Sequence, residues 1–277
     1  MRISMIELLN EGKFGNPEVC EDLYVVTDDF VAVIDGATNI SDRLIGGKAP
    51  GRFAAEVVQE TLLEAEAEVT LVELIGQINE SLQSKYERLN LVREIEQYAW
   101  MAPTACLICY SRYFEEVWQI GDSLCMIDGQ LHTNEKPLDA ITANARSLYL
   151  ETELKNGKTI ENLMDHDTGW DFIKPLIKQQ YYLQNDTENQ YGFEVINGFD
   201  IDFSRVKTIK VPEDAKTIIL ASDGYPIIKE SIEETEAALN ELLAIDPLCF
   251  RQFKSAKGLQ KGNKSFDDRT YIKFQVR

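Results

Sequence analysis

Three acidic motifs stand at the ends of apolar, β-rich runs and are the side chains of this chain best suited to chemistry. Residues 31–34 lead into Asp35-Gly36, and residues 217–222 lead into Asp223-Gly224. Asp267-Asp268 precedes the last apolar run of the chain. A strand-end carboxylate, followed by a glycine that lets the next carbonyl turn the same way, supplies the oxygen ligands that a hard cation prefers. The pattern predicts one site built from three strand-end carboxylates.

A predicted hairpin brings two further acids toward the same place. Residues 23–27 and 30–34 are both β-rich, and only Asp28-Asp29 separates them, which predicts a tight antiparallel hairpin. Glu21-Asp22 precedes the first strand of this hairpin, and Asp35 follows the second. Acids that are distant in sequence are therefore expected to become neighbours in space.

Asp122 is another acid at a strand end. It lies in Gly121-Asp122-Ser123, between β-rich runs at residues 116–120 and 124–127. The spacing alone favours a turn-forming aspartate whose side chain caps its own backbone.

The cysteines and histidines favour no other catalytic centre. The five cysteines are odd in number and scattered, unlike a disulfide framework. Cys106 and Cys109 lie within a β-rich run and are expected to pack in the core. His132 and His166 have no neighbour at metal-ligand spacing, so we expect neither a zinc site nor a histidine-based triad.

The composition is that of a globular protein with one core. The chain has 277 residues, of which 44% are hydrophobic and 27% charged, and we expect a single domain over residues 1–277. No apolar run approaches the roughly 18 residues of a membrane helix, and the first residues lack the pattern of a secretion signal. We therefore expect a cytoplasmic protein that does not contact a membrane, with a monomer as the default oligomeric state.

The formal net charge is strongly negative. Asp and Glu number 47 and Lys and Arg 28, which gives −19 at pH 7. Such a chain repels nucleic acids and anionic membrane surfaces at long range. Nucleic-acid binding is therefore disfavoured.

Apolar periodicity predicts alternating β and helical regions. Helical spacing occurs at residues 53–62 and 71–82, and residues 137–185 are helix-rich. A helix over residues 231–243 would begin at an S-x-x-E capping box of Ser231 and Glu234. The β-rich runs outside the first hairpin are residues 2–9, 104–112, 116–120, 124–127, 193–196, 206–211, 217–222 and 270–276. Because hairpin turns such as Asp128-Gly129 connect several of these runs, we expect antiparallel sheets.

The acidic motifs occur in an order and an approximate spacing that resemble the metal-dependent protein phosphatases of the type 2C (PPM) family, in a divergent, bacterial-type form. The motifs are Glu21-Asp22, Ile34-Asp35-Gly36, Gly121-Asp122-Ser123, Ser222-Asp223-Gly224 and Asp267-Asp268-Arg269, and they span nearly the whole chain. The resemblance implies an α+β fold, a four-layer α-β-β-α sandwich with two central antiparallel sheets flanked by helices.

The resemblance also implies how these residues would hold metal ions. Asp35 would bridge two divalent cations, Mn²⁺ or Mg²⁺, and the carbonyl of Gly36 would bind one of them. Asp223 and Asp267 would complete the direct ligands. Glu21-Asp22 would hold metal-bound water.

The activity implied by the resemblance is hydrolysis of phosphoserine and phosphothreonine in proteins. A water that bridges the two metals would attack phosphorus directly, without a covalent enzyme intermediate. In this picture Asp35, Asp223 and Asp267 act through the bound metals, and Asp122 would take part in a third metal site. The implied partner is a phosphorylated protein substrate.

The chain departs from the family at the phosphate-binding position. The arginine that usually stands four residues before the first acid is replaced by Pro17. The nearest cations along the chain are Lys13, Arg43 and Lys48, which are the candidate phosphate-binding residues. A lysine does not reproduce the bidentate fork of a guanidinium.

Two other functions are considered. The missing arginine, together with Ile227 at a position where the family often has an acid, fits a type 2C-like regulatory or binding module that is catalytically weak or inactive. Residues 33–38 also resemble the acidic motif of haloacid dehalogenase-type phosphatases, but that chemistry needs an aspartate nucleophile where this chain has Val33.

The helix-rich residues 137–185 have two interpretations. They are longer than a simple connection requires, so they could form a substrate-facing flap. Extra cover for the core is the alternative.

Overall fold

The computed structural model describes residues 3–41 and 43–276, which contain two antiparallel five-stranded sheets. The first, called the β10 sheet, has the order β1 (Ile3–Glu11), β10 (Arg269–Val276), β9 (Thr217–Ala221), β6 (Leu124–Ile127) and β7 (Gln130–His132). The second, called the β3 sheet, has the order β2 (Leu23–Val26), β3 (Phe30–Gly36), β4 (Ala105–Ser111), β5 (Glu116–Ile120) and β8 (Lys207–Lys210).

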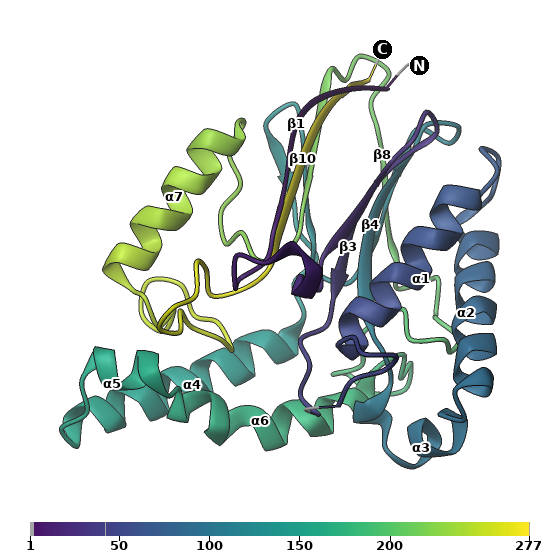
Figure 1. Cartoon of the computed structure of the whole chain (residues 1–277). Helices are drawn as coiled ribbons and strands as arrows, with labels where there is room; N and C mark the ends of the chain where they lie inside the picture. Colours follow the sequence, from purple (N-terminus) through teal and green to yellow (C-terminus); the bar gives the residue numbers. More distant parts are fainter. Residues whose placement is uncertain (1–2, 42, 277) are drawn as a thin grey trace.

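Helices cover the outer face of each sheet. Figure 1 shows α1 (Pro50–Glu64) and α2 (Leu71–Arg88) against the β3 sheet and α7 (Ile232–Ile245) on the opposite side of the molecule, against the β10 sheet. The order of layers is therefore helix, sheet, sheet, helix. This confirms the predicted α+β fold, a four-layer sandwich with two central antiparallel sheets.

Strand β3 is buried on both faces, which explains its continuous apolar sequence. Val31 and Val33 pack between the two sheets, whereas Phe30, Ala32 and Ile34 pack toward α1 and α2. Because side chains alternate between the faces of a strand, a strand that packs on both faces needs apolar residues at every position. The sequence keeps this pattern until Asp35, where the strand reaches the end of the sandwich.

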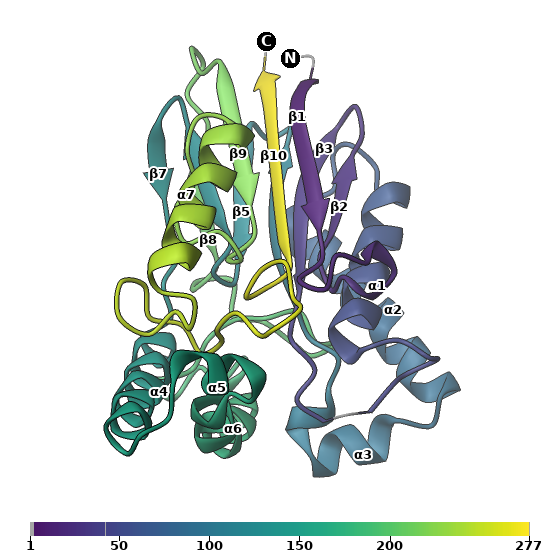
Figure 2. The same ribbon diagram turned by 60° about the vertical axis from the view of Figure 1, so that its left-hand side comes forward.

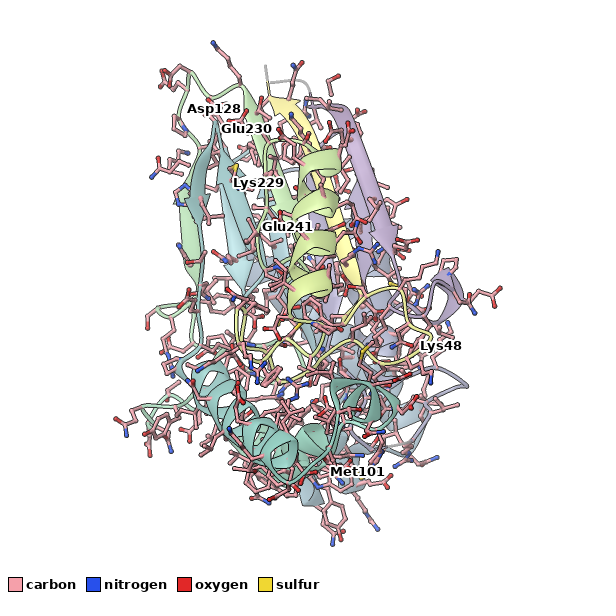
Figure 3. The ribbon with its side chains drawn as sticks, turned by 90° about the vertical axis from the view of Figure 1, so that its left-hand side faces the viewer. Lys48, Met101, Asp128, Lys229, Glu230 and Glu241 are labelled. Carbon is pink, nitrogen blue, oxygen red and sulfur yellow. The ribbon has the colours of Figure 1, made fainter. Side chains whose placement is uncertain are left out.

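Three helices lie across one end of the sandwich. They are α4 (Pro137–Lys155), α5 (Ile160–Asp165) and α6 (Thr168–Gln180), and both views in Figures 1 and 2 place them opposite the chain termini. The hairpin turn at Asp128 and the nearby Glu230 lie at the other end, as Figure 3 shows. The helix-rich region 137–185 therefore covers the end of the sandwich at which β3 delivers Asp35.

A buried arginine fixes α4 to the rest of the fold. Arg146 is 0% exposed, and its Nε and Nη2 both donate to Oδ2 of Asp167, at 3.1 and 2.6 Å. Its Nη1 donates to the carbonyl oxygens of Leu248 and Ser255 at 2.9 and 3.0 Å. Asp167 caps α6 by accepting from the Trp170 N–H. One side chain thus holds α4, the start of α6 and the loop after α7 together.

The local predictions agree with the structure except in one segment. Ser231 caps α7 by accepting a hydrogen bond from the Glu234 N–H at 3.2 Å, which confirms the predicted helix start. Residues 193–196 form no strand and make only isolated bridges, between Gln184 and Phe193 and between Ala105 and Ile196. The Val195 N–H donates to the Asn185 side chain at 2.9 Å instead of to a neighbouring strand, because asparagine side chains compete with backbone ladders.

None of the helices in residues 3–41 and 43–276 combines the length and the apolar character needed to cross a membrane.

Candidate metal-binding active site

The strand register brings four of the predicted acids to one edge of the sandwich. Ala221, the last residue of β9, pairs with Leu124 at the start of β6 and with Tyr271 near the start of β10. The segments that carry Asp122, Asp223 and Asp267 therefore leave or enter the sheet at the same edge. In the β3 sheet, Asp35 pairs with Cys106 near the start of β4. The next residue of β4, Leu107, pairs with Ile120 at the end of β5, two residues before Asp122. Residues far apart in sequence are placed together by antiparallel pairing.

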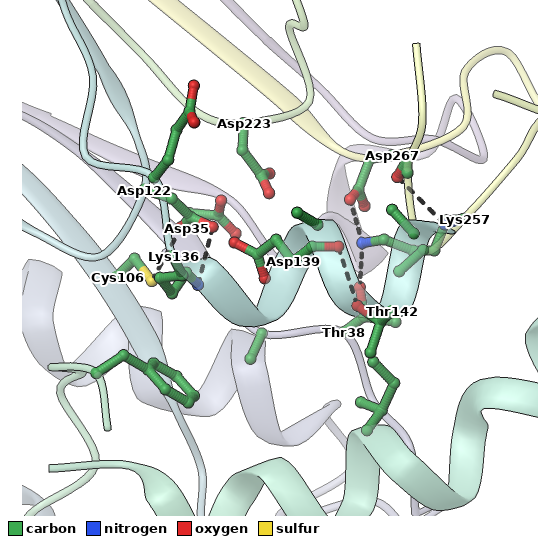
Figure 4. A pocket seen from close by; sticks show the side chains of 18 of the residues that line it. Asp35, Thr38, Cys106, Asp122, Lys136, Asp139, Thr142, Asp223, Lys257 and Asp267 are labelled. Carbon is green, nitrogen blue, oxygen red and sulfur yellow. Dashed lines mark hydrogen bonds and ion pairs between the residues drawn. The ribbon is translucent and has the colours of Figure 1, made fainter. Parts of the chain in front are cut away.

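These four aspartates face a cavity of about 510 Å³ beneath α4. Figure 4 shows Asp35, Asp122 and Asp223 pointing toward one another, with Asp267 on the wall beside Lys257. A fifth aspartate, Asp139 in the first turn of α4, points into the same group and also lines the cavity. The cavity is the size of an ordinary ligand site.

Gly36 is required here for a steric reason. A Cβ atom on Gly36 would lie 2.5 Å from the carbonyl oxygen of Glu21 and 2.6 Å from the carbonyl carbon of Gly51. Real Cβ atoms do not approach backbone this closely, so the start of α1 and the Glu21 segment can pack against β3 only when residue 36 has no side chain. The resemblance assigned this glycine a carbonyl ligand, and close packing is a second reason for its presence.

Asp35 and Asp223 lie among other carboxyl groups, and several of these raise their pKa values. Figure 4 shows the two side chains pointing toward one another, and two ionised carboxylates placed in this way repel each other. Burial and the carboxylates of Asp223, Asp22, Asp122 and Asp267 raise the pKa of Asp35. Burial, Asp122 and Asp267 raise the pKa of Asp223 to about 7, although this side chain is reached by solvent through the cavity.

Lysines compensate the other two aspartates of the cavity. The Lys136 ammonium group lies 2.8 Å from the Asp122 carboxylate. Burial alone would raise the pKa of Asp122, but the charge of Lys136 outweighs burial and lowers this pKa. Lys257 contacts the Asp267 carboxylate and donates to the Thr38 hydroxyl at 2.8 Å. Lys257 and Lys13 likewise outweigh burial and lower the pKa of Asp267.

Glu21, Asp22 and Lys13 lie behind the cavity wall and are almost fully buried. The Lys13 ammonium group lies 3.2 Å from Glu21 and 3.4 Å from both Asp267 and Asp268. Asp22 accepts a hydrogen bond from the Thr270 hydroxyl at 3.1 Å. Glu21-Asp22 is therefore next to the aspartate cluster, as the hairpin predicted, and Lys13 is a buried counter-ion to the acids.

The structure places the two other candidate phosphate-binding residues away from this cavity. Arg43 forms an ion pair with Glu94, at the start of α3 (Val92–Gln97). Lys48 forms an ion pair with Glu56 on α1 and lies at the periphery of the molecule in Figure 3. Pro17, which replaces the usual arginine, begins a short 3-10 helix and is exposed. The chain segments that carry these three residues therefore do not bring them to the cavity.

Four cavity residues were not singled out as site residues from the sequence: Cys106, Lys136, Asp139 and Lys257. The Cys106 thiol lines the cavity rather than the core and donates weakly to Asp122 at a distance of 3.6 Å. Burial and Asp122 raise the pKa of this thiol, so it is neutral. The clustering of lysines and glycines at residues 254–264 is the one sequence signal that could have indicated Lys257.

The donor atoms of this site fit a divalent cation, although the site is not closed around one. No group of three acidic, histidine or cysteine side chains in residues 3–41 and 43–276 is arranged to hold a metal ion directly. However, the ionisable groups that raise the pKa of Asp35 are all carboxylates, and Glu21 has a buried oxygen, Oε1, without a hydrogen-bond partner. Oxygen-only donors suit Mg²⁺ or Mn²⁺ rather than zinc. The Lys257 contact with Asp267 is what such an ion would displace.

Comparison with known proteins gives matches among solved structures. No protein-family model matches the chain, and no curated protein matches it either. Similar structures include a serine/threonine phosphatase, PstP/Ppp, of Mycobacterium tuberculosis (15% identity, 100% of both chains, TM-score 0.46). They also include PppA, a regulatory component of type VI secretion in Pseudomonas aeruginosa (14%, 100% and 99%, 0.48), and the serine/threonine phosphatase Stp1 of Staphylococcus aureus (14%, 100% and 98%, 0.46). These are likenesses at low identity, and the site described above is built by this chain's own strands.

Proposed function

We propose that this protein is a metal-dependent phosphatase that hydrolyses phosphoserine and phosphothreonine in proteins. The observation that carries the proposal is the group of four carboxyl side chains, Asp35, Asp122, Asp223 and Asp267, on the wall of one cavity. Four carboxyl groups crowded in this way repel one another unless protons or cations neutralise them. The organisation of the strands toward this one point supports a metal site.

Asp35, the Gly36 carbonyl, Asp223 and Asp267 are the residues that would hold two divalent cations, Mn²⁺ or Mg²⁺. Such ions supply Lewis-acid polarisation of a phosphoryl oxygen and activation of water. Glu21-Asp22 lies directly behind these ligands and would orient their hydration, and Asp122 would take part only in a further metal site.

The chain's own cations suit the phosphate group of a substrate. Lys136 and Lys257 both line the cavity, and a lysine ammonium binds phosphate oxygens as a point charge. The two lysines would bind the substrate phosphate in place of the arginine that the type 2C family usually has where this chain has Pro17. Because the Cys106 thiol is neutral, it is not a nucleophile in this cavity, and hydrolysis by water in a single displacement fits better.

Residues 137–185 would form a substrate-facing flap on the single domain. Helix α4 contributes Asp139, Thr142 and Ala143 to the cavity wall, and α6 contributes Trp170 and Ile177. A segment with this position limits access of bulk water and selects what reaches the aspartates. The monomeric state and the cytoplasmic location stay predictions.

Phosphate release tests the proposal. The purified chain, freed of metal with a chelator, is incubated with a phosphothreonine peptide and with para-nitrophenyl phosphate, each with and without Mn²⁺. We expect release only with the metal, and a loss of about 100-fold or more in Asp35→Asn and Asp223→Asn, since each removes a ligand charge. The matched control, Glu213→Gln, changes an exposed acid outside the cavity and should retain full activity.

The same variants address the alternative of a catalytically weak or inactive module. Activity that persists in both Asp35→Asn and Asp223→Asn would refute the proposed metal chemistry. Absence of Mn²⁺ binding at millimolar concentration, together with absence of phosphate release, would favour the module.

A further inference from the structure

We infer that the preferred substrates carry a large apolar side chain next to the phosphorylated residue, and that this side chain binds in the part of the cavity beneath α6. This inference rests on the proposed phosphatase function and specifies the substrates of that same site. It follows from the lining of the cavity, from its continuity with the aspartates and from the charge of the protein.

Four separate segments contribute apolar residues to the lining of the cavity, and these residues are called the apolar wall. Trp170 and Ile177 come from α6, Phe193 and Val195 come from the segment after it, and Leu124 and Phe266 come from the strand ends beside the aspartates. The whole cavity measures about 510 Å³, which is far more than a phosphoryl group and a threonine side chain fill. Apolar walls of this kind bind apolar groups because they remove them from water.

The apolar wall begins directly beside the acids. The ring of Phe193 lies 5.2 Å from the Lys136 ammonium nitrogen, and that nitrogen lies 2.8 Å from Asp122. A group in contact with Phe193 is therefore within one residue's length of a phosphate at the aspartates. This short distance favours a side chain adjacent to the phosphorylated residue, rather than a remote part of the substrate, as the group that contacts Phe193.

The net charge of the protein favours apolar over acidic recognition. At −19, the chain repels phosphopeptides with acidic flanking residues. Long-range attraction is therefore a poor source of substrate affinity for this protein, whereas contact with the apolar wall is not affected by the charge. Hydrophobic pockets discriminate substrates by about 10-fold to 200-fold for modest changes in apolar size.

Helix α6 offers a matched pair of aromatic residues. Trp170 lines the cavity, whereas Phe172, two positions later, is 54% exposed and stacks on Tyr149 with ring centroids 4.5 Å apart. Substitution of either removes one aromatic side chain from the same helix. Only the first removes part of the proposed binding wall.

The experiment compares two phosphothreonine peptides that differ only in the residue after phosphothreonine, which is Phe or Ser. With Mn²⁺ present, we expect the wild-type chain to have a kcat/KM about 10-fold or more higher for the Phe peptide. Trp170→Ala should reduce this preference to less than about 3-fold, mainly through KM, and Phe172→Ala should keep it. Thermal unfolding confirms that each variant is folded, and Ile177→Ala replaces Trp170→Ala if the latter is not.

Each outcome has a defined meaning. Equal kcat/KM values of the wild type for the two peptides would overturn this inference and leave the proposed function intact. Hydrolysis of an aryl phosphate such as naphthyl phosphate far in excess of both peptides would overturn the assignment of a peptide side chain to the wall. No hydrolysis of any of these esters with Mn²⁺ would overturn the proposed function itself.

Discussion

Lys257 is expected to compete with metal ions for Asp267, and its removal should strengthen metal binding. The Lys257 ammonium group contacts the Asp267 carboxylate and donates to Thr38 at 2.8 Å, and its side chain is 25% exposed. A metal ligated by Asp267 must break this contact. Two unit charges about 4 Å apart attract by about 4 kcal/mol at the effective dielectric of a protein surface, and recovered hydration of the ammonium group offsets part of that. The net competition is therefore about 1–3 kcal/mol.

The perturbation is Lys257→Met, which keeps the length of the side chain and removes its charge. Since 1.4 kcal/mol corresponds to a factor of ten, we expect a rise of about 10-fold to 100-fold in the Mn²⁺ affinity of the weaker of the two proposed sites, measured by titration calorimetry. The metal-free variant should at the same time be less stable than wild type, because Asp267 loses a counter-ion. These two effects have opposite signs, so a general loss of structure does not produce both.

The control is Lys254→Met in the same loop. The Lys254 ammonium group donates to the Asn144 side chain at 2.8 Å, which is not an acid, so this substitution should leave Mn²⁺ affinity unchanged. Equal or weaker Mn²⁺ binding by Lys257→Met than by wild type would refute the idea that the lysine and the metal compete.

Three further predictions concern the frame around the site. Gly36→Ala should lower the free energy of unfolding by about 3 kcal/mol in chemical denaturation, because its Cβ would collide with backbone; unchanged stability would contradict the packing described. Arg146→Met should cost about 3–5 kcal/mol by leaving buried Asp167 unpaired, and hydrogen exchange should speed up in residues 137–180; unaltered exchange there would show that the arginine does not fix α4. The pKa of Glu236 is lowered because its hydrogen bonds and ion pair with Arg269 outweigh burial, so this pair stabilises the fold above pH 4.5 and is lost as pH falls; Glu236→Gln should cost about 1 kcal/mol at pH 7 and progressively less as pH falls below 4.5, and a pH-independent difference would contradict this.

The antiparallel sheets and three aspartates of the cavity could be predicted because each depends on local sequence, whereas the four-layer sandwich was implied by the resemblance to the type 2C family. Asp35 and Asp223 end buried strands, and Asp267 precedes one, so the position of the carboxylate follows from where an apolar run stops. The antiparallel sheets could be predicted from short connections with turn residues. The number of strands in each sheet and their order could not, since these depend on pairings between distant segments.

Asp139 and Lys257 were missed because tertiary packing, rather than strand position, places them. Asp139 lies in the first turn of α4, where an acid is also favoured by the helix dipole, so its sequence context is ordinary. Lys257 reaches the cavity only because the loop after α7 folds back to it. Conversely, Arg43 and Lys48 are close in sequence to Asp35, yet they pair with Glu94 and Glu56, since the chain turns from β3 toward α1.

The central claim is that Asp35 and Asp223, with Asp267, form a site for two divalent cations. The most direct measurement is a crystal structure of the protein soaked with Mn²⁺, with the ions located by anomalous scattering. We predict two anomalous peaks in contact with Asp35, with Asp223 and Asp267 as further ligands and Lys257 displaced from Asp267. Occupied Mn²⁺ sites elsewhere, with Lys257 still on Asp267 and no peak at Asp35, would contradict the account.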